Sequence, residues 1–186
     1  MSKRILGVLG VLIMGAGIMS SGVAVAQERS PHTGSTAVGI DAGAFVPVDD
    51  ELDPGLVVNA LLEYYVTPRF SLRTNFGLTN PGFSRDPDAS LRQIPLRVDA
   101  NYNWERGKWH PFVGAGFGAY FIQVRNNGEA FGQSATEPGF NLGGGIEYFT
   151  SRTVSIKGEA RYHVIGDTQG LNPSGMVFTG GLKKYF

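Results

Sequence analysis

The sequence has no cysteine among its 186 residues, which excludes disulfide bonds and thiolate metal sites. It has no excess charge of either sign, because Lys plus Arg and Asp plus Glu each number 16. A balanced chain offers no basic surface for a nucleic-acid partner, so none is expected. Beyond the N-terminal segment, no apolar run reaches the length of about 18 residues that indicates a membrane-spanning helix.

The N-terminal segment has the form of a secretory signal peptide. Lys3 and Arg4 precede an uncharged apolar run over 5–18, and Ala24-Val25-Ala26 supplies small residues for cleavage. A membrane-anchoring helix is the alternative, but the run is shorter than the roughly 20 residues that such a helix needs. We therefore predict a signal peptide over 1–26, which leaves 186 − 26 = 160 residues as one exported domain, 27–186.

The exported part alternates between apolar and polar residues with a period of two. In 93–104 one parity carries Ile94, Leu96, Val98 and Tyr102, and the other carries charged or amide residues apart from Pro95. Such alternation predicts β-strands with one apolar and one polar face. Reading the whole domain this way gives strands at 36–46, 55–66, 69–79, 93–104, 109–124, 138–149, 154–164 and 175–186.

The connections between these segments alternate between short and long. Short turns fall at 67–68, 105–108 and 150–151, whereas longer polar segments fall at 47–54, 80–90, 125–137 and 165–174. Long strands joined in this way predict an all-β fold, an eight-stranded antiparallel transmembrane β-barrel with short periplasmic turns and longer extracellular loops. Pro95 cannot donate to a strand ladder, so we expect a bulge or a local ladder defect there.

The orientation of the two faces decides between a soluble barrel and a membrane barrel. The apolar parity carries far more large side chains than an eight-stranded lumen can hold, so it must face lipid. The polar parity then lines the lumen and supplies five acids and five bases, which should pair with one another because unpaired buried charges are costly. The predicted lumen charge network is Asp41, Glu63, Arg73, Arg97, Asp99, Glu147, Lys157, Glu159, Arg161 and Lys183.

Aromatic residues of the apolar parity gather near the short-turn ends of the strands. This placement predicts a girdle at one membrane interface, made of Tyr64, Phe70, Tyr102, Trp104, Trp109, Tyr148 and Phe186.

Three stretches also resemble a known family: 109–121 (WHPFVGAGFGAYF), 154–163 (VSIKGEARYH) and 180–186 (GGLKKYF). On these the domain resembles the outer membrane protein β-barrel domain family, the small OmpA/OmpX-like barrels. The resemblance implies a bacterial outer-membrane location. It also implies that Leu182, Tyr185 and Phe186 form an assembly signal read by the barrel-assembly machinery, although Lys184 stands where an apolar residue is usual.

No motif in the chain indicates catalysis, a cofactor or a metal. The Gly114-x-Gly116-x-x-Ala119 pattern lies within a continuous strand, so it lacks the helix that a dinucleotide fingerprint requires. His163 has no nucleophile beside it, and we expect it to form a hydrogen bond in the lumen. We therefore expect a non-enzymatic barrel with a structural or surface-interaction role. The alternatives are a narrow channel for ions or small solutes, a lipid-modifying enzyme and a soluble ligand-binding barrel. The expected partners are outer-membrane lipid, lipopolysaccharide and the assembly machinery, and the expected state is a monomer.

Overall fold

The computed structural model describes residues 31–130, 134–167 and 170–186, with the side chain of residue 87 excepted. The predicted signal peptide over 1–26 lies outside the described residues. The strands are β1 (Thr36–Pro47), β2 (Gly55–Tyr65), β3 (Phe70–Asn80), β4 (Gly82–Phe83), β5 (Asp86–Asn103), β6 (Trp109–Asn126), β7 (Glu129–Ala130), β8 (Ala135–Phe149), β9 (Val154–Ile165) and β10 (Gly175–Tyr185). No helix among the described residues is long and apolar enough to cross a membrane.

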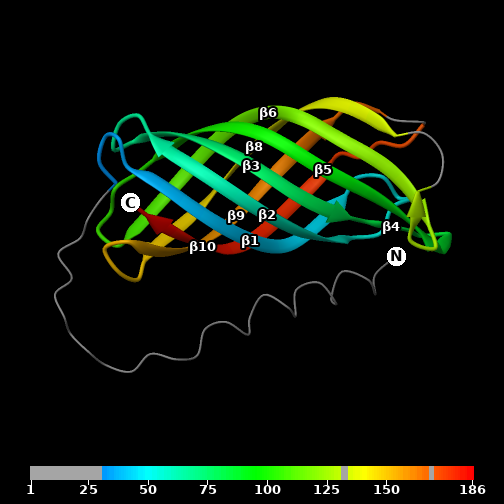
Figure 1. Cartoon of the computed structure of the whole chain (residues 1–186), viewed down its shortest axis with the longest axis horizontal. Coiled ribbons are helices and arrows are strands. Elements are labelled where there is room, and N and C mark those ends of the chain that lie inside the picture. The colour runs from blue at the N-terminus through cyan, green and yellow to red at the C-terminus, as the bar shows by residue number, and fades with distance from the viewer. Residues whose placement is uncertain (1–30, 131–133, 168–169) are drawn as a thin grey trace, which may run out of the picture.

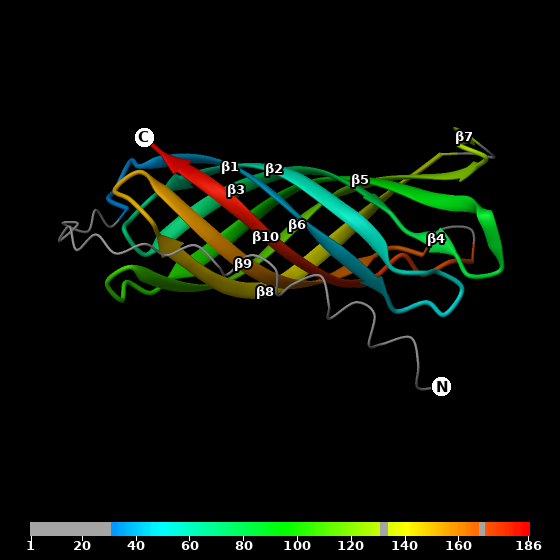
Figure 2. The same ribbon diagram turned by 90° about the horizontal axis from the view of Figure 1, so that it is seen from below.

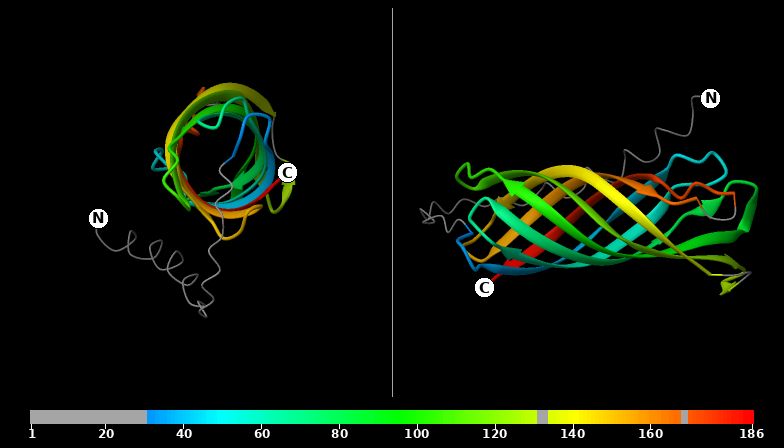
Figure 3. Two further views of the ribbon diagram at one scale, coloured as in Figure 1. Left: turned by 90° about the vertical axis from the view of Figure 1, so that its left-hand side faces the viewer. Right: turned by 90° about the horizontal axis from the view of Figure 1, so that it is seen from above.

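Eight of these strands form a closed antiparallel barrel. Each long strand pairs with the next one along the chain, and β10 pairs with β1 to complete the ring. Figure 3 shows the closed ring when the molecule is viewed along its axis. The fold class predicted from the alternation is confirmed.

The connections sort to the two ends of the barrel as expected. The short turns, the start of β1 and the C-terminus lie together at one end, and the longer loops lie at the other (Figure 1). These are called the turn end and the loop end below.

Two predicted loops are partly strand. β5 begins at Asp86 and β6 continues to Asn126, so this pair rises beyond its neighbours at the loop end (Figure 2). Asn127 and Gly128 have positive φ angles of 50° and 80° and join β6 to the short strand β7. An Asn-Gly pair in this conformation is the preferred two-residue hairpin turn, which explains why the pairing continues above the barrel.

Pro95 interrupts one ladder without shifting it. The β3–β5 ladder lacks the rungs of Gly77 and Leu78, yet Phe76↔Leu96 below and Thr79↔Gln93 above keep one register. The β5–β6 ladder runs through Pro95 without a break. The expected local defect is therefore present, but the alternative of a bulge is wrong: the missing proline N–H removes pairing on the β3 side and no extra residue is inserted.

The two faces of the strands have opposite chemistry. The outer face carries exposed apolar side chains, including Ile40, Phe140 and Leu142, each about two-thirds exposed or more. On the inner face, some positions lie so close to neighbouring atoms that only a residue without a side chain fits. A Cβ on Gly116 would overlap Asp99 Oδ1 and lie 2.5 Å from the Val98 carbonyl oxygen, so glycine there makes room for a buried carboxylate.

Candidate functional site: the barrel lumen

All ten residues of the predicted lumen charge network point into the barrel. Lys183 lies at the turn-end side of the network, fully buried between two carboxylates. Its Nζ is 2.6 Å from Glu63 Oε2 and 2.8 Å from Glu147 Oε2. The same nitrogen lies 4.9 Å from the ring centroid of Tyr185, so one ammonium group is held by two acids and an aromatic face.

Glu159 is the centre of the network. Its carboxylate lies 2.9 Å from Arg73 Nη1, 2.7 Å from Lys157 Nζ and 2.7 Å from Arg161 Nη2. Lys157 also lies 2.6 Å from Asp41, and Arg73 reaches Glu63 at 3.3 Å. Arg73 and Glu159 are 86 positions apart in the sequence, and it is the closure of the barrel that brings them together.

Asp99 and Arg97 form the loop-end side of the network. Asp99 accepts hydrogen bonds from Asn75 at 2.6 Å and Asn141 at 2.9 Å, and it lies 3.7 Å from Arg161. Arg97 Nη1 lies 3.6 Å from Asp99, and this is its one ion pair among the described residues. Each of the other four cations has an ion pair of 2.9 Å or shorter, so Arg97 is the least firmly paired of the five.

Neutral polar residues complete the network, and the sequence analysis did not single them out. Asn59 donates to Asp41 at 2.6 Å, Ser71 donates to Glu63 at 2.5 Å, and Ser155 donates to Glu147. Each shares the inward parity of the charged residues, which is the signal that could have found them.

Buried apolar side chains lie on both sides of the charges. At the turn end, Ala37, Tyr65, Phe149 and Tyr185 form a buried cluster. At the loop end, a second cluster contains Leu52 from the first loop together with Leu91, Tyr120, Ile122 and Ile165, and Phe83 and Val124 pack against it. Leu91, Ile122 and Ile165 lie on the inward parity, but the sequence analysis expected only a polar interior.

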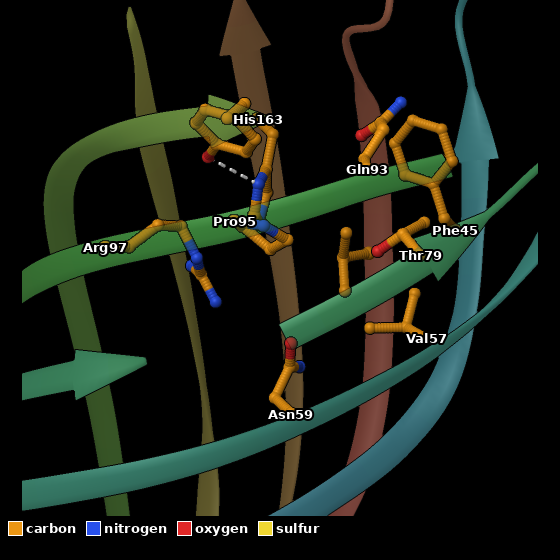
Figure 4. A pocket seen from close by; sticks show the side chains of 10 residues that line it. Phe45, Val57, Asn59, Thr79, Gln93, Pro95, Arg97 and His163 are labelled. Carbon is orange, nitrogen blue, oxygen red and sulfur yellow. Dashed lines mark hydrogen bonds between the residues drawn. The ribbon is translucent and has the colours of Figure 1, made fainter. Parts of the chain in front are cut away.

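A small cavity lies between the charge network and the loop-end apolar cluster (Figure 4). It offers about 10 Å³ to the centre of a water-sized particle, which is close to the minimum for one water molecule. His163 Nδ1 forms a hydrogen bond with the Tyr120 hydroxyl at 2.8 Å, as the sequence analysis expected for this histidine. His163 Nε2, Gln93 Nε2 and Arg97 Nε have no hydrogen-bond partner in the described part of the chain. No group of three or more acidic or histidine side chains within that part could hold a metal ion.

The aromatic residues predicted for the girdle lie on the outer face near the turn end. Tyr64, Phe70, Trp104, Trp109 and Phe186 are exposed, and Tyr102 and Tyr148 are half-buried against neighbours. The ring centroids of Phe70 and Tyr102, Tyr102 and Trp104, and Trp109 and Tyr148 lie 5.0, 4.9 and 4.6 Å apart, respectively. These contacts form two aromatic groups on the outside of the barrel.

The three residues predicted for the assembly signal do not share one face. Leu182 and Phe186 are exposed on the outer face, whereas the Tyr185 side chain is buried in the lumen. The Tyr185 hydroxyl donates to Glu147 and lies 3.2 Å from the Tyr65 hydroxyl. Lys184 is exposed, and its Nζ donates to Thr153 Oγ1 at 2.9 Å.

A family model described as "Outer membrane protein beta-barrel domain" matches residues 13–186. The chain belongs to this family. The barrel domain is therefore a bacterial outer-membrane protein, as the sequence analysis predicted. A search of curated proteins finds no match.

Solved structures share the fold of this barrel domain at low sequence identity. Neisserial surface protein A is 16% identical, with a TM-score of 0.72, and the alignment covers 82% of this chain and 99% of that chain. OprG from Pseudomonas aeruginosa is 12% identical (TM-score 0.62; 86% and 99% covered). Ail, the attachment invasion locus protein of Yersinia pestis, is also 12% identical (TM-score 0.58; 83% and 99% covered).

The loops of the barrel domain are joined by contacts between acidic and polar groups. Asp49 accepts backbone hydrogen bonds from Asn172 at 3.0 Å and Glu51 at 2.9 Å, and these lower the pKa of its carboxyl group. Glu51 also pairs with Arg85 at 3.4 Å. Asp49 thus links the first long loop to the last one.

Proposed function

We propose that this chain is a non-enzymatic outer-membrane barrel with a closed lumen, which acts as a monomer by supporting the envelope or by presenting its loops at the cell surface. The observation that supports this proposal is the set of ion pairs across the lumen. They join side chains from β1, β2, β3, β5, β8, β9 and β10. A solute would have to separate these pairs in order to pass.

Two physical arguments favour a closed lumen. Separating a buried ion pair leaves uncompensated charges in a low-dielectric interior, which is strongly unfavourable. A hydrated ion that passed the charges would then meet the apolar clusters at both ends. His163 is buried inside the barrel, so the barrel wall separates it from lipid, which supports a role without chemistry on an acyl chain.

Conductance in a planar bilayer tests the proposal. The refolded chain, shown to be folded by its heat-dependent migration in a denaturing gel, is expected to give no discrete current steps. Reproducible steps of one size from folded protein would contradict a closed lumen.

A narrow channel is the second candidate, because unpaired nitrogen donors of Gln93, Arg97 and His163 offer polar contacts beside the charge network. If current steps occur, the variants Arg97→Gln and Lys157→Gln should shift the channel toward cation selectivity. A selectivity unchanged by both variants would place the conducting path outside this lumen.

We further propose outer-membrane lipid, lipopolysaccharide and the barrel-assembly machinery as partners. Leu182 on the outer face of β10 and Phe186 directly after β10 are exposed, so another protein can contact them during insertion. Deleting Phe186 is expected to lower the amount of chain assembled in the outer membrane while leaving refolding into detergent unchanged. Equal assembly of both forms would remove Phe186 from the signal.

A further inference from the structure

Exposed charges of opposite sign lie at opposite ends of the barrel. The turn end carries five basic side chains and one acidic side chain, Glu105; the basic ones are Arg69, Arg106, Lys108, Arg152 and Lys184. The loop end carries three basic side chains, Arg85, Arg92 and Arg125, and nine acidic ones: Asp49, Asp50, Glu51, Asp53, Asp86, Asp88, Glu129, Glu137 and Asp167. Among the described side chains, the net charge is therefore 5 − 1 = +4 at the turn end and 3 − 9 = −6 at the loop end.

The five turn-end cations surround the barrel. Arg69 lies in the β2–β3 turn, Arg106 and Lys108 lie in the β5–β6 turn, Arg152 lies in the β8–β9 turn, and Lys184 is near the end of β10. Because these connections are spread around the ring in Figure 3, the cations form a rim. This set of five residues is called the basic rim.

The basic rim is accessible, and its side chains form no ion pair with an acid among the described residues. Four of its side chains are exposed and Lys108 is half-buried. No described acid lies within ion-pair distance of any of the five, whereas all ten lumen charges are paired. The cations are thus free to meet an external anion.

The position of the basic rim indicates what that anion is. Arg106 and Lys108 lie in the β5–β6 turn, and two residues of the aromatic girdle, Trp104 and Trp109, flank them in the sequence. Aromatic side chains of this kind lie at the level of lipid headgroups. Beside Arg152, a small groove lined by His32, Thr153 and Phe186 offers about 50 Å³ at the same level.

We propose that the basic rim binds anionic phospholipid headgroups, such as phosphatidylglycerol, in the membrane leaflet at the turn end. Each basic side chain close to an anionic membrane surface contributes about 1 kcal/mol, and a cluster attracts several lipids at once. The proposal holds whether or not the lumen conducts, because it concerns the outer surface only.

The two tryptophans report directly on the lipid beside them. The full-length mature chain is refolded into vesicles of phosphatidylcholine and phosphatidylglycerol at one fixed composition, with bromine on the acyl chains of either one lipid or the other. Brominated phosphatidylglycerol is expected to quench the emission of Trp104 and Trp109 more strongly than the fraction of phosphatidylglycerol in the bilayer predicts. An enrichment of about fivefold corresponds to ~1 kcal/mol.

Matched variants assign the enrichment to the basic rim. Arg106→Gln with Lys108→Gln should reduce quenching to the bulk composition, whereas Arg85→Gln with Arg125→Gln at the loop end should leave it unchanged. Concentrated salt should act like the rim variant, because it screens surface charge. Quenching that follows the bulk composition in the unaltered chain, or enrichment that survives the rim variant, would overturn the proposal. Folding of every form is checked by heat-dependent gel migration.

Discussion

Removing the Lys183 ammonium group is the sharpest test of the lumen network. The Lys183→Met variant fills a similar volume but leaves Glu147 without a cation, because Lys183 is its only ion-pair partner within the described chain. Glu63 keeps Arg73 at 3.3 Å and is less affected. Breaking a buried pair by removing one partner costs about 3–5 kcal/mol, so the free energy of unfolding should fall by about that amount.

A second substitution separates lost charge from lost packing. Glu147→Gln keeps an oxygen that accepts hydrogen bonds from Ser155 and Tyr185, but it removes the negative charge. The double variant with Lys183→Met should recover most of the loss, since no charge is left unpaired at this point. Urea unfolding in phospholipid vesicles, followed by tryptophan emission, measures each form. A loss below about 1 kcal/mol for the single variant, or a double variant no more stable than it, would refute the reasoning.

Three further predictions concern the wall and the loops. Gly116→Ala should destabilise the barrel by about 1–3 kcal/mol because its new methyl group overlaps a buried carboxylate. Gly158→Ala, where no atom lies within 4 Å of the added carbon, should have little effect in the same urea titration, and equal losses would contradict the crowding argument. Leu52→Ala should loosen the first long loop, because that side chain is 4% exposed in the loop-end cluster; faster limited proteolysis at 48–54 with an intact barrel is the expected result. Asp49 has a folded-state pKa below its usual 3.8, so its contribution to loop stability is present above that pH and is lost as the pH falls through the lowered value. An acid-stable protease should therefore cleave the loop faster at such low pH in the unaltered chain, and Asp49→Asn should reduce this dependence.

The alternation in the sequence predicted the faces of the barrel residue by residue. In a strand the side-chain period is two, so one correctly oriented residue orients all the others. This is why the sequence alone orients the ten lumen charges and the exposed apolar side chains. The same alternation places the Tyr185 side chain in the lumen and Leu182 and Phe186 outside, whereas the assembly signal that the resemblance implies groups the three by their place in the last segment of the chain.

Partners within the lumen could not be predicted in the same way. The pairing of Arg73 with Glu159 depends on the tilt of the strands and on the closure of β10 against β1, which a local pattern does not contain. The loop-end apolar cluster was missed for a different reason. Leu52 lies in 47–54 and Leu91 directly follows 80–90, two segments rich in Pro and Asp that were interpreted as loops, whereas β5 extends through the second of them.

The two missing rungs beside Pro95 divide the seam between β3 and β5 into parts of unequal strength. Below the proline, seven consecutive pairs run from Phe70↔Tyr102 to Phe76↔Leu96, and above it the ladder resumes only at Thr79↔Gln93. Strand separation that begins at the loop end therefore meets little resistance until it reaches Pro95, and then meets a continuous run of hydrogen bonds. Backbone amides of β3 above this point should exchange with solvent deuterium sooner than those below it, so that the loop end can loosen while the turn end stays closed.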